Sequence, residues 1–203
     1  LNAAQKIPFI NNRITNCYNY RKHAGRDAKK SAHRPHEFCY KSHQEGSAII
    51  FPNTSASSRE YIPGGFTDDS IIINKEAFAI YNHEIHILGL LMSRIHRVWI
   101  ATVGGRLGEG FRYSVKLVYN TFPFPSISKQ RKEELTQCTL NIIDERLKHS
   151  EKTLAQLYDP DKMPEGLKEA HRQNDLAVER CYRSSPFSSD EERLEYLFKL
   201  YEK

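Results

Sequence analysis

Residues 99–125 read WIATVGGRLGEGFRYSVKLVYNTFPFP and join the end of an apolar segment to a strand-like run, Val115–Tyr119. Four glycines punctuate the turn between them: Gly104, Gly105, Gly108 and Gly110. Glycine accepts positive φ angles and lets a backbone approach a partner closely. The pattern therefore predicts a tight turn that can reach into a partner molecule.

Three charged side chains lie in or beside this turn, namely Arg106, Glu109 and Arg112. They suit the reading of base edges, because arginine pairs with guanine and a carboxylate accepts a hydrogen bond from cytosine. Two alternatives stay open. The segment can be an ordinary glycine-rich surface loop, or the two arginines can hold the loop itself in shape.

The pattern also carries a family resemblance. Trp99, Gly105–Leu107, Phe111–Ser114 and Val118–Pro125 together resemble the target recognition domain of MmeI-like enzymes, which are large bacterial DNA methyltransferases often fused to a nuclease. Two further stretches are similar to the same family, Ser57–Phe66 before this segment and Thr153–Pro164 after it. At Gly108 and Gly110 the chain departs from the larger side chains that family members often carry nearby, which leaves the target sequence open.

The resemblance implies sequence-specific binding of double-stranded DNA in the service of adenine-N6 methylation. It implies a methyltransferase domain in the same parent chain as partner, with S-adenosylmethionine bound there and no cofactor bound here. The chain begins at Leu1 rather than Met, which suggests a fragment of a longer protein. We therefore expect a specificity region without catalytic residues.

Basic residues concentrate in the first half of the 203-residue chain. Residues 1–126 hold 16 Lys and Arg against 9 Asp and Glu, whereas residues 127–203 hold 14 against 16. Within residues 1–34, eight basic residues face one acid, Asp27. Such asymmetry favours a polyanionic partner for the first half. A solvated linker helix is the alternative for residues 1–34.

Candidate phosphate contacts come from two places. The lead-in contributes Arg13, Arg21, Lys22, Lys29 and Lys30. A later polar loop contributes Ser57, Ser58 and Arg59. Contacts of this kind fix the register of a protein on DNA without reading sequence. Arg94 and Arg97, by contrast, lie on the polar side of an apolar helical pattern, and we expect structural ion pairs for them. A phosphate contact by one of the two is the alternative.

The periodicity predicts an α+β fold in three parts. These are a basic helical lead-in over residues 1–34, a recognition domain over residues 35–126 with a small mixed or antiparallel sheet and a buried helix, and an all-α domain over residues 127–203. Strands are predicted at Ala48–Phe51, Arg59–Ile62, Ser70–Asn74 and Phe78–Tyr81. One long helix is predicted over Glu84–Ala101 with Asn82 as its cap, and later helices are predicted to begin after Ser128, near Thr153, at Pro164 and after Ser188 or Ser189.

Several chemistries are not predicted. The sequence lacks the glycine-rich turn after a first strand that holds S-adenosylmethionine, and it lacks an (Asn/Asp/Ser)-Pro-Pro-(Tyr/Phe) loop. No metal site is predicted, because His83 and His86 do not form the H-E-x-x-H pattern and the four cysteines occur singly. No run of 18 apolar residues indicates a membrane helix, so a cytoplasmic protein is expected.

Two rival functions remain. One is a helical protein-interaction adaptor that uses Tyr119, Phe122 and Phe124 as an exposed aromatic contact. The other is a metal hydrolase assembled from the nine histidines. Salt-dependent binding to duplex DNA would separate the main hypothesis from the first rival, and metal analysis would test the second.

Overall fold

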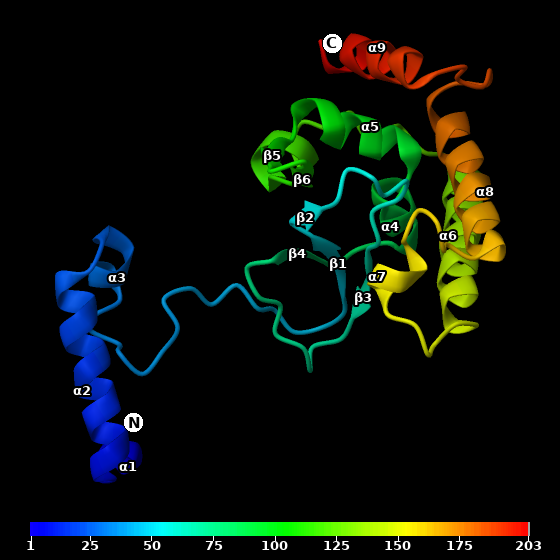
Figure 1. Ribbon diagram of the computed structural model, residues 1–203. Helices are drawn as coiled ribbons and strands as arrows, with labels where there is room; N and C mark the ends of the chain where they lie inside the picture. Colours follow the sequence, from blue (N-terminus) through cyan, green and yellow to red (C-terminus); the bar gives the residue numbers. More distant parts are fainter. Residues whose placement is uncertain (203) are drawn as a thin grey trace. The chain divides into compact units, whose positions relative to one another are not determined.

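The structure is a computed structural model that describes residues 1–202 (Figure 1). It comprises two compact units, Leu1–His43 and a second unit that runs from Gln44 to the end of the chain. Helices and two small antiparallel sheets make up the fold, which confirms the predicted α+β class. Among residues 1–202, no helix has the length and apolar character needed to cross a membrane.

The first unit is helical, as predicted for residues 1–34. It contains α1 (Asn2–Gln5), α2 (Pro8–His23) and α3 (Arg26–Lys30). Pro8 occupies the first helical position of α2, where its missing N–H would have no partner within the helix. Ser31 is the one buried residue among those described in this unit, so its helices present almost all of their surface.

The first sheet of the second unit places one strand between two antiparallel neighbours. Its order is β3-β1-β4, with bounds Gly65–Thr67, Ala48–Pro52 and Ala77–Tyr81. Two predicted strands are thereby confirmed, as β1 and β4. In β1 the side chains of Ile49 and Phe51 are fully buried while Ile50 between them is half-buried, as the alternation of a strand requires.

Two other predicted strands are wrong. The segment Arg59–Ile62 is an irregular loop, in which Tyr61 packs into the core and donates its hydroxyl to Asp175 at 2.8 Å. The segment Ser70–Asn74 is also irregular, and Ile72 is 73% exposed. Asp68 accepts a hydrogen bond from the backbone N–H of Ser70 at 2.9 Å, so side-chain capping of a turn overrides the isoleucine run.

The second sheet contains the glycine-rich turn. Its order is β2-β6-β5, with bounds Thr54–Ser55, Gly110–Arg112 and Gly105–Leu107. The strands β5 and β6 form a hairpin closed by Gly108 and Glu109, and Gly108 has a φ of 58°. The sequence thus predicted the turn, and the structure adds a strand on each side of it.

The run Val115–Tyr119, read as strand-like from sequence, is instead a π-helical turn, η1. Its defining hydrogen bond runs from the N–H of Asn120 to the carbonyl oxygen of Val115 at 2.9 Å. Ser114 caps the turn by accepting from the N–H of Leu117. Capping and an alternative local hydrogen-bond pattern therefore outweigh the β-branched composition.

The predicted long helix consists of two helices, α4 (Ile85–Leu91) and α5 (Arg94–Val103). Ser93 makes the break: its hydroxyl donates to the carbonyl oxygen of Leu90 at 2.7 Å and accepts from the N–H of His96. The predicted cap at Asn82 is also wrong, because Glu84 holds the N-cap position. Asn82 lies before the helix with a φ of 52°.

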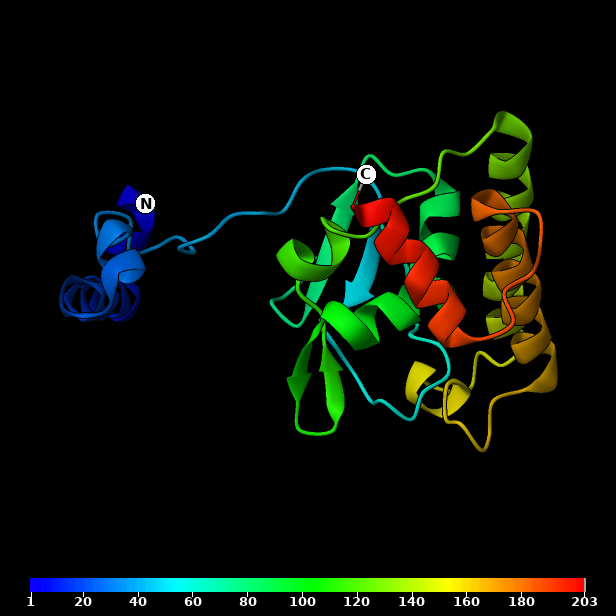
Figure 2. The ribbon, with the colours of Figure 1, turned by 90° about the horizontal axis from the view of Figure 1, so that it is seen from above.

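The C-terminal part is helical, as predicted. It contains α6 (Lys129–Leu147), α7 (Leu154–Leu157), α8 (Glu165–Tyr182) and α9 (Asp190–Tyr201). Ser128, Thr153 and Ser189 accept the N-cap hydrogen bonds of α6, α7 and α9, which confirms these predicted helix starts. Helices α6 and α8 lie side by side, and α9 lies along α5 (Figures 1 and 2).

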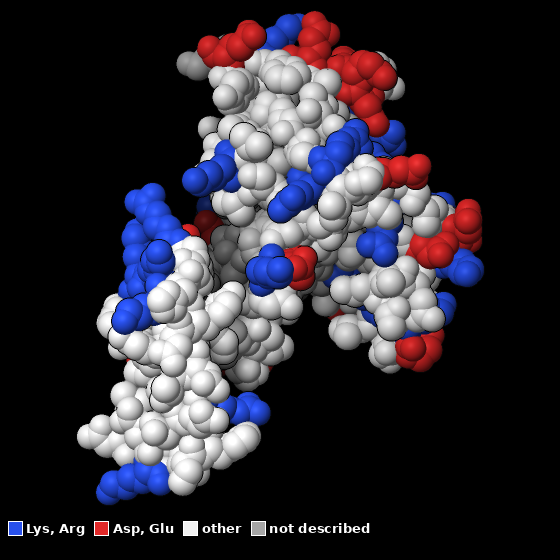
Figure 3. All heavy atoms as spheres, turned by 60° about the vertical axis from the view of Figure 1, so that its left-hand side comes forward, with Lys and Arg blue, Asp and Glu red and all other residues white. Residues whose placement is uncertain are grey.

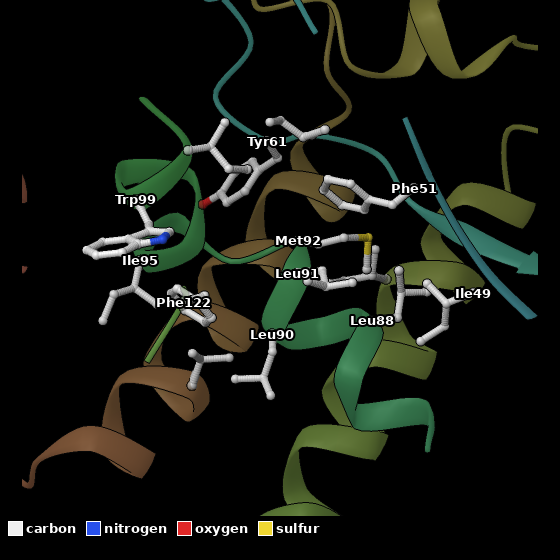
Figure 4. Packing of buried hydrophobic residues seen from close by; sticks show 14 of the residues in the cluster. Ile49, Phe51, Tyr61, Leu88, Leu90, Leu91, Met92, Ile95, Trp99 and Phe122 are labelled. Atoms are coloured by element: carbon white, nitrogen blue, oxygen red, sulfur yellow. The ribbon is translucent and has the colours of Figure 1, made fainter. Parts of the chain in front are cut away.

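One continuous core joins the sheets to the C-terminal helices. Figure 4 shows α4 and α5 at its centre, where Leu88, Met92 and Trp99 pack with side chains from the sheet and from later segments. Arg146 of α6 is buried beneath them and donates to the carbonyl oxygen of Gly64 at 2.6 Å. The predicted domain boundary at residues 126/127 therefore crosses a shared core, and the division itself stays a prediction.

Candidate nucleic-acid interface

The β5–β6 hairpin projects from the second unit (Figure 2) and carries the three candidate base readers. In its register Arg106 lies opposite Phe111, and Gly105 lies opposite Arg112. Directly opposed residues of an antiparallel pair share a face, and successive residues alternate. Arg106 and Arg112 consequently extend from opposite faces of the hairpin, with Glu109 in the turn between the strands.

The three candidate readers differ in how firmly the protein holds them. Arg106 is exposed, but its guanidinium lies 4.8 Å from the centroid of the Phe111 ring and donates to the carbonyl oxygen of Ala101 at 3.3 Å. Glu109 and Arg112 are exposed, and among residues 1–202 their side chains form no hydrogen bond or ion pair. These two side chains are therefore the ones most available to a ligand.

The candidate phosphate loop adjoins the hairpin. Strand β2, which begins this loop, pairs with β6, so that Thr54 lies opposite Arg112. Ser58 is exposed, whereas Ser57 and Arg59 are half-buried. The structure thus brings residues 57–59, which follow β2, next to the hairpin, although the two segments lie about 50 positions apart in the sequence.

Arg97 of α5 binds this loop through two backbone carbonyl oxygens. Its Nε donates to the carbonyl oxygen of Arg59 and its Nη2 to that of Ser57, each at 2.9 Å. The expected ion pair of Arg97 is therefore wrong, whereas that of Arg94 is confirmed by Asp190 at 2.8 Å. Sequence reasoning missed the role of Arg97, because nothing in a helical pattern indicates that an arginine will bind backbone carbonyls.

His96 supports the end of the hairpin. Its ring is fully buried, with Nδ1 2.8 Å from the carbonyl oxygen of Leu91 and Nε2 3.1 Å from the hydroxyl of Tyr113. Burial lowers the pKa of His96 to about 4, so the imidazole is neutral near pH 7. Tyr113, which follows Arg112 directly, is thereby anchored in the core.

The candidate phosphate residues of the first unit fall into two groups. Four are exposed on the helices α2 and α3: Arg13, Lys22, Lys29 and Lys30. Arg21 is half-buried, and it donates to the carbonyl oxygens of Ser31, Arg34 and Glu37 at 3.1, 2.9 and 2.7 Å. Its guanidinium therefore holds the segment after α3 against α2, which leaves it less available to a phosphate than the other four.

The distribution of surface charge follows the basic excess in the first half of the chain. Figure 3 shows Lys and Arg side chains with few acids over the first unit, whereas Asp and Glu gather over α9. The first turn of α9 carries Asp190, Glu191 and Glu192, which favour the positive end of the helix dipole. The acidic surface thus has a local structural cause in this helix.

The structure also corrects the aromatic contact on which the adaptor hypothesis relied. Phe122 is 4% exposed and packs against His96, with ring centroids 4.7 Å apart. Tyr119 is half-buried, so Phe124 alone of the three is exposed. For the metal hypothesis, the described residues contain no group of three or more His, Cys, Asp or Glu placed to hold an ion.

Comparisons with known proteins agree along the whole chain. Residues 1–126 match the family model of the MmeI target recognition domain, and residues 127–203 match that of the MmeI C-terminal domain. DNA methyltransferase A of Bacillus subtilis (strain 168) is 43% identical over 196 residues, which cover 96% of this chain and 22% of that protein.

A solved structure is similar throughout as well. It is described as the type IIL restriction-modification enzyme MmeI in complex with DNA; it is 33% identical, with a TM-score of 0.91 over 98% of this chain and 27% of that one. The chain thus spans about a quarter of the length of these relatives. On these matches, it belongs to the MmeI family, as a target recognition domain followed by the C-terminal domain.

Proposed function

We propose that this chain binds double-stranded DNA and recognises a specific sequence, as the specificity region of a bacterial DNA methyltransferase. The observation that carries the proposal is the projecting hairpin, which exposes Glu109 and Arg112 and whose strand β6 pairs with β2, the strand that leads into the loop of residues 57–59. The relatives support it, since one is named a DNA methyltransferase and the other is described in complex with DNA.

Backbone contacts would hold the duplex in register. In this proposal, four exposed basic side chains neutralise phosphates and release counterions, which gives affinity without sequence preference. They are Arg13, Lys22, Lys29 and Lys30. Ser57, Ser58 and Arg59 add contacts next to the hairpin, and Arg21 keeps the first unit folded.

Base contacts would supply specificity. Arg112 and Glu109 are free to enter a groove, where arginine suits guanine and a carboxylate suits cytosine, and each good contact discriminates by roughly 1–3 kcal/mol. Arg106 can join them only by leaving the Phe111 ring or by reaching past it. We therefore rank Arg112 and Glu109 ahead of Arg106 as base readers.

Methyl transfer is assigned to the parent protein and not to this chain. S-adenosylmethionine does not fit the described residues, because Gly104 and Gly105 follow helix α5 and precede a strand, the reverse of a strand–glycine–helix turn. We propose that the cofactor and the adenine-N6 chemistry belong to a methyltransferase domain elsewhere in the same polypeptide. Because its proposed substrate is bacterial DNA, we place the protein in the cytoplasm.

The test is to map methylated adenines in DNA modified by the full-length protein that carries Arg112→Gln or Glu109→Gln. We expect a changed or relaxed base at one position of the recognised sequence, with methylation still present. Arg172→Gln is the matched control, because Arg172 is an exposed arginine of α8 paired with Glu169. An unchanged sequence in both hairpin variants would remove these residues from base reading, and the absence of any site-specific methylation by the wild type would overturn the proposed function.

A further inference from the structure

Arg97 contacts both of the surfaces that the proposed function assigns to DNA. On one side, its two donated hydrogen bonds of 2.9 Å join the carbonyl oxygens of Ser57 and Arg59. The planar guanidinium has donors in a fixed fork, so a single side chain sets the spacing of two carbonyls in one loop. The loop can then present its hydroxyls and Arg59 in one conformation.

On the other side, Arg97 contacts the hairpin. Its guanidinium carbon lies 5.5 Å from the centroid of the Phe111 ring, and Phe111 is 4% exposed in β6. The same ring contacts Arg106, the residue opposite it in the register. Arg97 therefore lies between the loop and the strand that carries Arg112, and it contacts both through geometry that depends on a planar cation.

The position of Arg97 imposes a desolvation cost on its charged guanidinium. Arg97 is partly buried, burial lowers the pKa of its guanidinium, and none of the ion pairs formed among residues 1–202 includes it. Arg94, one turn earlier on the same helix, has Asp190 as a partner. Asp190 and Glu60 favour the charge only through space. A desolvated cation that forms no ion pair costs free energy, which an apolar side chain in the same space would avoid. The two hydrogen bonds to backbone carbonyls are thus the interactions that offset this cost, and an apolar side chain could not make them.

We propose that Arg97 is a positioning residue for DNA recognition: it fixes the loop of residues 57–59 relative to the β5–β6 hairpin, so that docking on phosphates sets the register in which the hairpin reads bases. The inference rests on the proposed function. It assigns Arg97 no contact with DNA, and it predicts that affinity and discrimination respond differently when the residue changes.

The experiment selects bound duplexes from a randomised library with the full-length protein, as wild type, Arg97→Lys, Arg97→Gln and Arg94→Gln. Affinities for the enriched duplex and for a scrambled duplex are then measured across a salt series. Arg97→Lys keeps the charge but loses the fork, and Arg97→Gln loses the charge. Arg94→Gln is the matched control, since it removes a neighbouring arginine whose partner is on α9. Each protein is measured well below its own unfolding temperature, so that instability does not enter the comparison.

We expect both Arg97 variants to lose at least about tenfold in the ratio of enriched to scrambled affinity. Binding to the scrambled duplex and its salt dependence should stay close to wild type, and Arg94→Gln should behave as wild type. Two results would overturn the proposal. One is a wild-type ratio in Arg97→Lys, and the other is an equal loss on both duplexes with a reduced salt slope, which would mark a direct phosphate contact. Failure of the wild type to enrich any sequence would instead refute the proposed function.

Discussion

Single buried residues show what this fold depends on, and Asp175 of α8 is the clearest example. It accepts hydrogen bonds from the hydroxyl of Tyr61 at 2.8 Å and from the backbone N–H of Arg94 at 2.7 Å. One carboxylate thus ties α8 to the loop between β2 and β3 and to the start of α5. Burial raises the pKa of Asp175 to about 7, in spite of these hydrogen bonds.

This raised pKa predicts a pH dependence of stability. The folded state favours the protonated carboxyl, so the contribution of Asp175 is full below pH 4 and is lost as the pH rises through about 7. Asp175→Asn should remove this loss and gain on the order of 2 kcal/mol relative to wild type between pH 5 and pH 8. Urea unfolding followed by the fluorescence of Trp99, the single tryptophan, would measure it. A difference between the two proteins that does not change with pH would contradict the assignment.

The β5–β6 hairpin depends on two glycines for different reasons. A Cβ on Gly110 would lie 2.8 Å from the carbonyl oxygen of Ser55 in β2, whereas a Cβ on Gly108 would meet open space. Gly108 needs only its positive φ of 58°, which asparagine tolerates. Gly110 is therefore required by the pairing of β2 with β6.

We accordingly expect Gly110→Ala to weaken the β2–β6 pairing and to lower discrimination among DNA sequences at least about tenfold in the full-length protein. Gly108→Asn, the matched control, should keep both the fold and the discrimination. Hydrogen exchange at the amides of residues 110–113, together with binding to an enriched and a scrambled duplex, would report the two effects. Equal exchange rates and equal discrimination in the two variants would show that the close approach of Gly110 is unimportant.

The elements also show how far sequence alone could predict this molecule. Helices with strong local signals were predicted closely, because Ser128, Thr153 and Ser189 cap them through short-range hydrogen bonds. The break at Ser93 and the π-helical turn after Ser114 escaped prediction, since a serine in an apolar pattern does not reveal which backbone group it will bind. Ile71 and Ile72 lie in an exposed irregular segment and not in the predicted strand, because the side chain of Asp68 binds the backbone N–H of Ser70.

The candidate site likewise has features that local sequence predicts and features that depend on tertiary contacts. The hairpin and its charged residues could be recognised from glycine spacing and family resemblance. The loop of residues 57–59 was found as a separate polar segment, but its pairing with the hairpin is a long-range β contact that no local pattern specifies. The support from His96 and Arg97 depends on tertiary contacts with Tyr113 and with two backbone carbonyls, which only the structure provides.

The second unit holds the base of the hairpin in a core that its sheets share with the C-terminal helices. Arg146 of α6 donates to the carbonyl oxygen of Gly64, to the sulfur of Met92 at 3.0 Å and to the hydroxyl of Tyr158. The C-terminal helices therefore share one core with both sheets, and the hairpin extends from that core with its readers exposed. A stable base of this kind is what precise contact with base edges requires.

Entry of the hairpin into a DNA groove can be measured by photocrosslinking. A benzophenone amino acid would replace Leu107 at the hairpin tip, which is 58% exposed, or Leu147 at the end of α6, which is 65% exposed and serves as the matched control. Each full-length variant would be irradiated on a duplex that contains the recognised sequence. Crosslinks from position 107 are expected to map within that sequence, and none are expected from position 147. No crosslink from position 107, or equal crosslinking from both positions, would contradict entry of the hairpin into the groove.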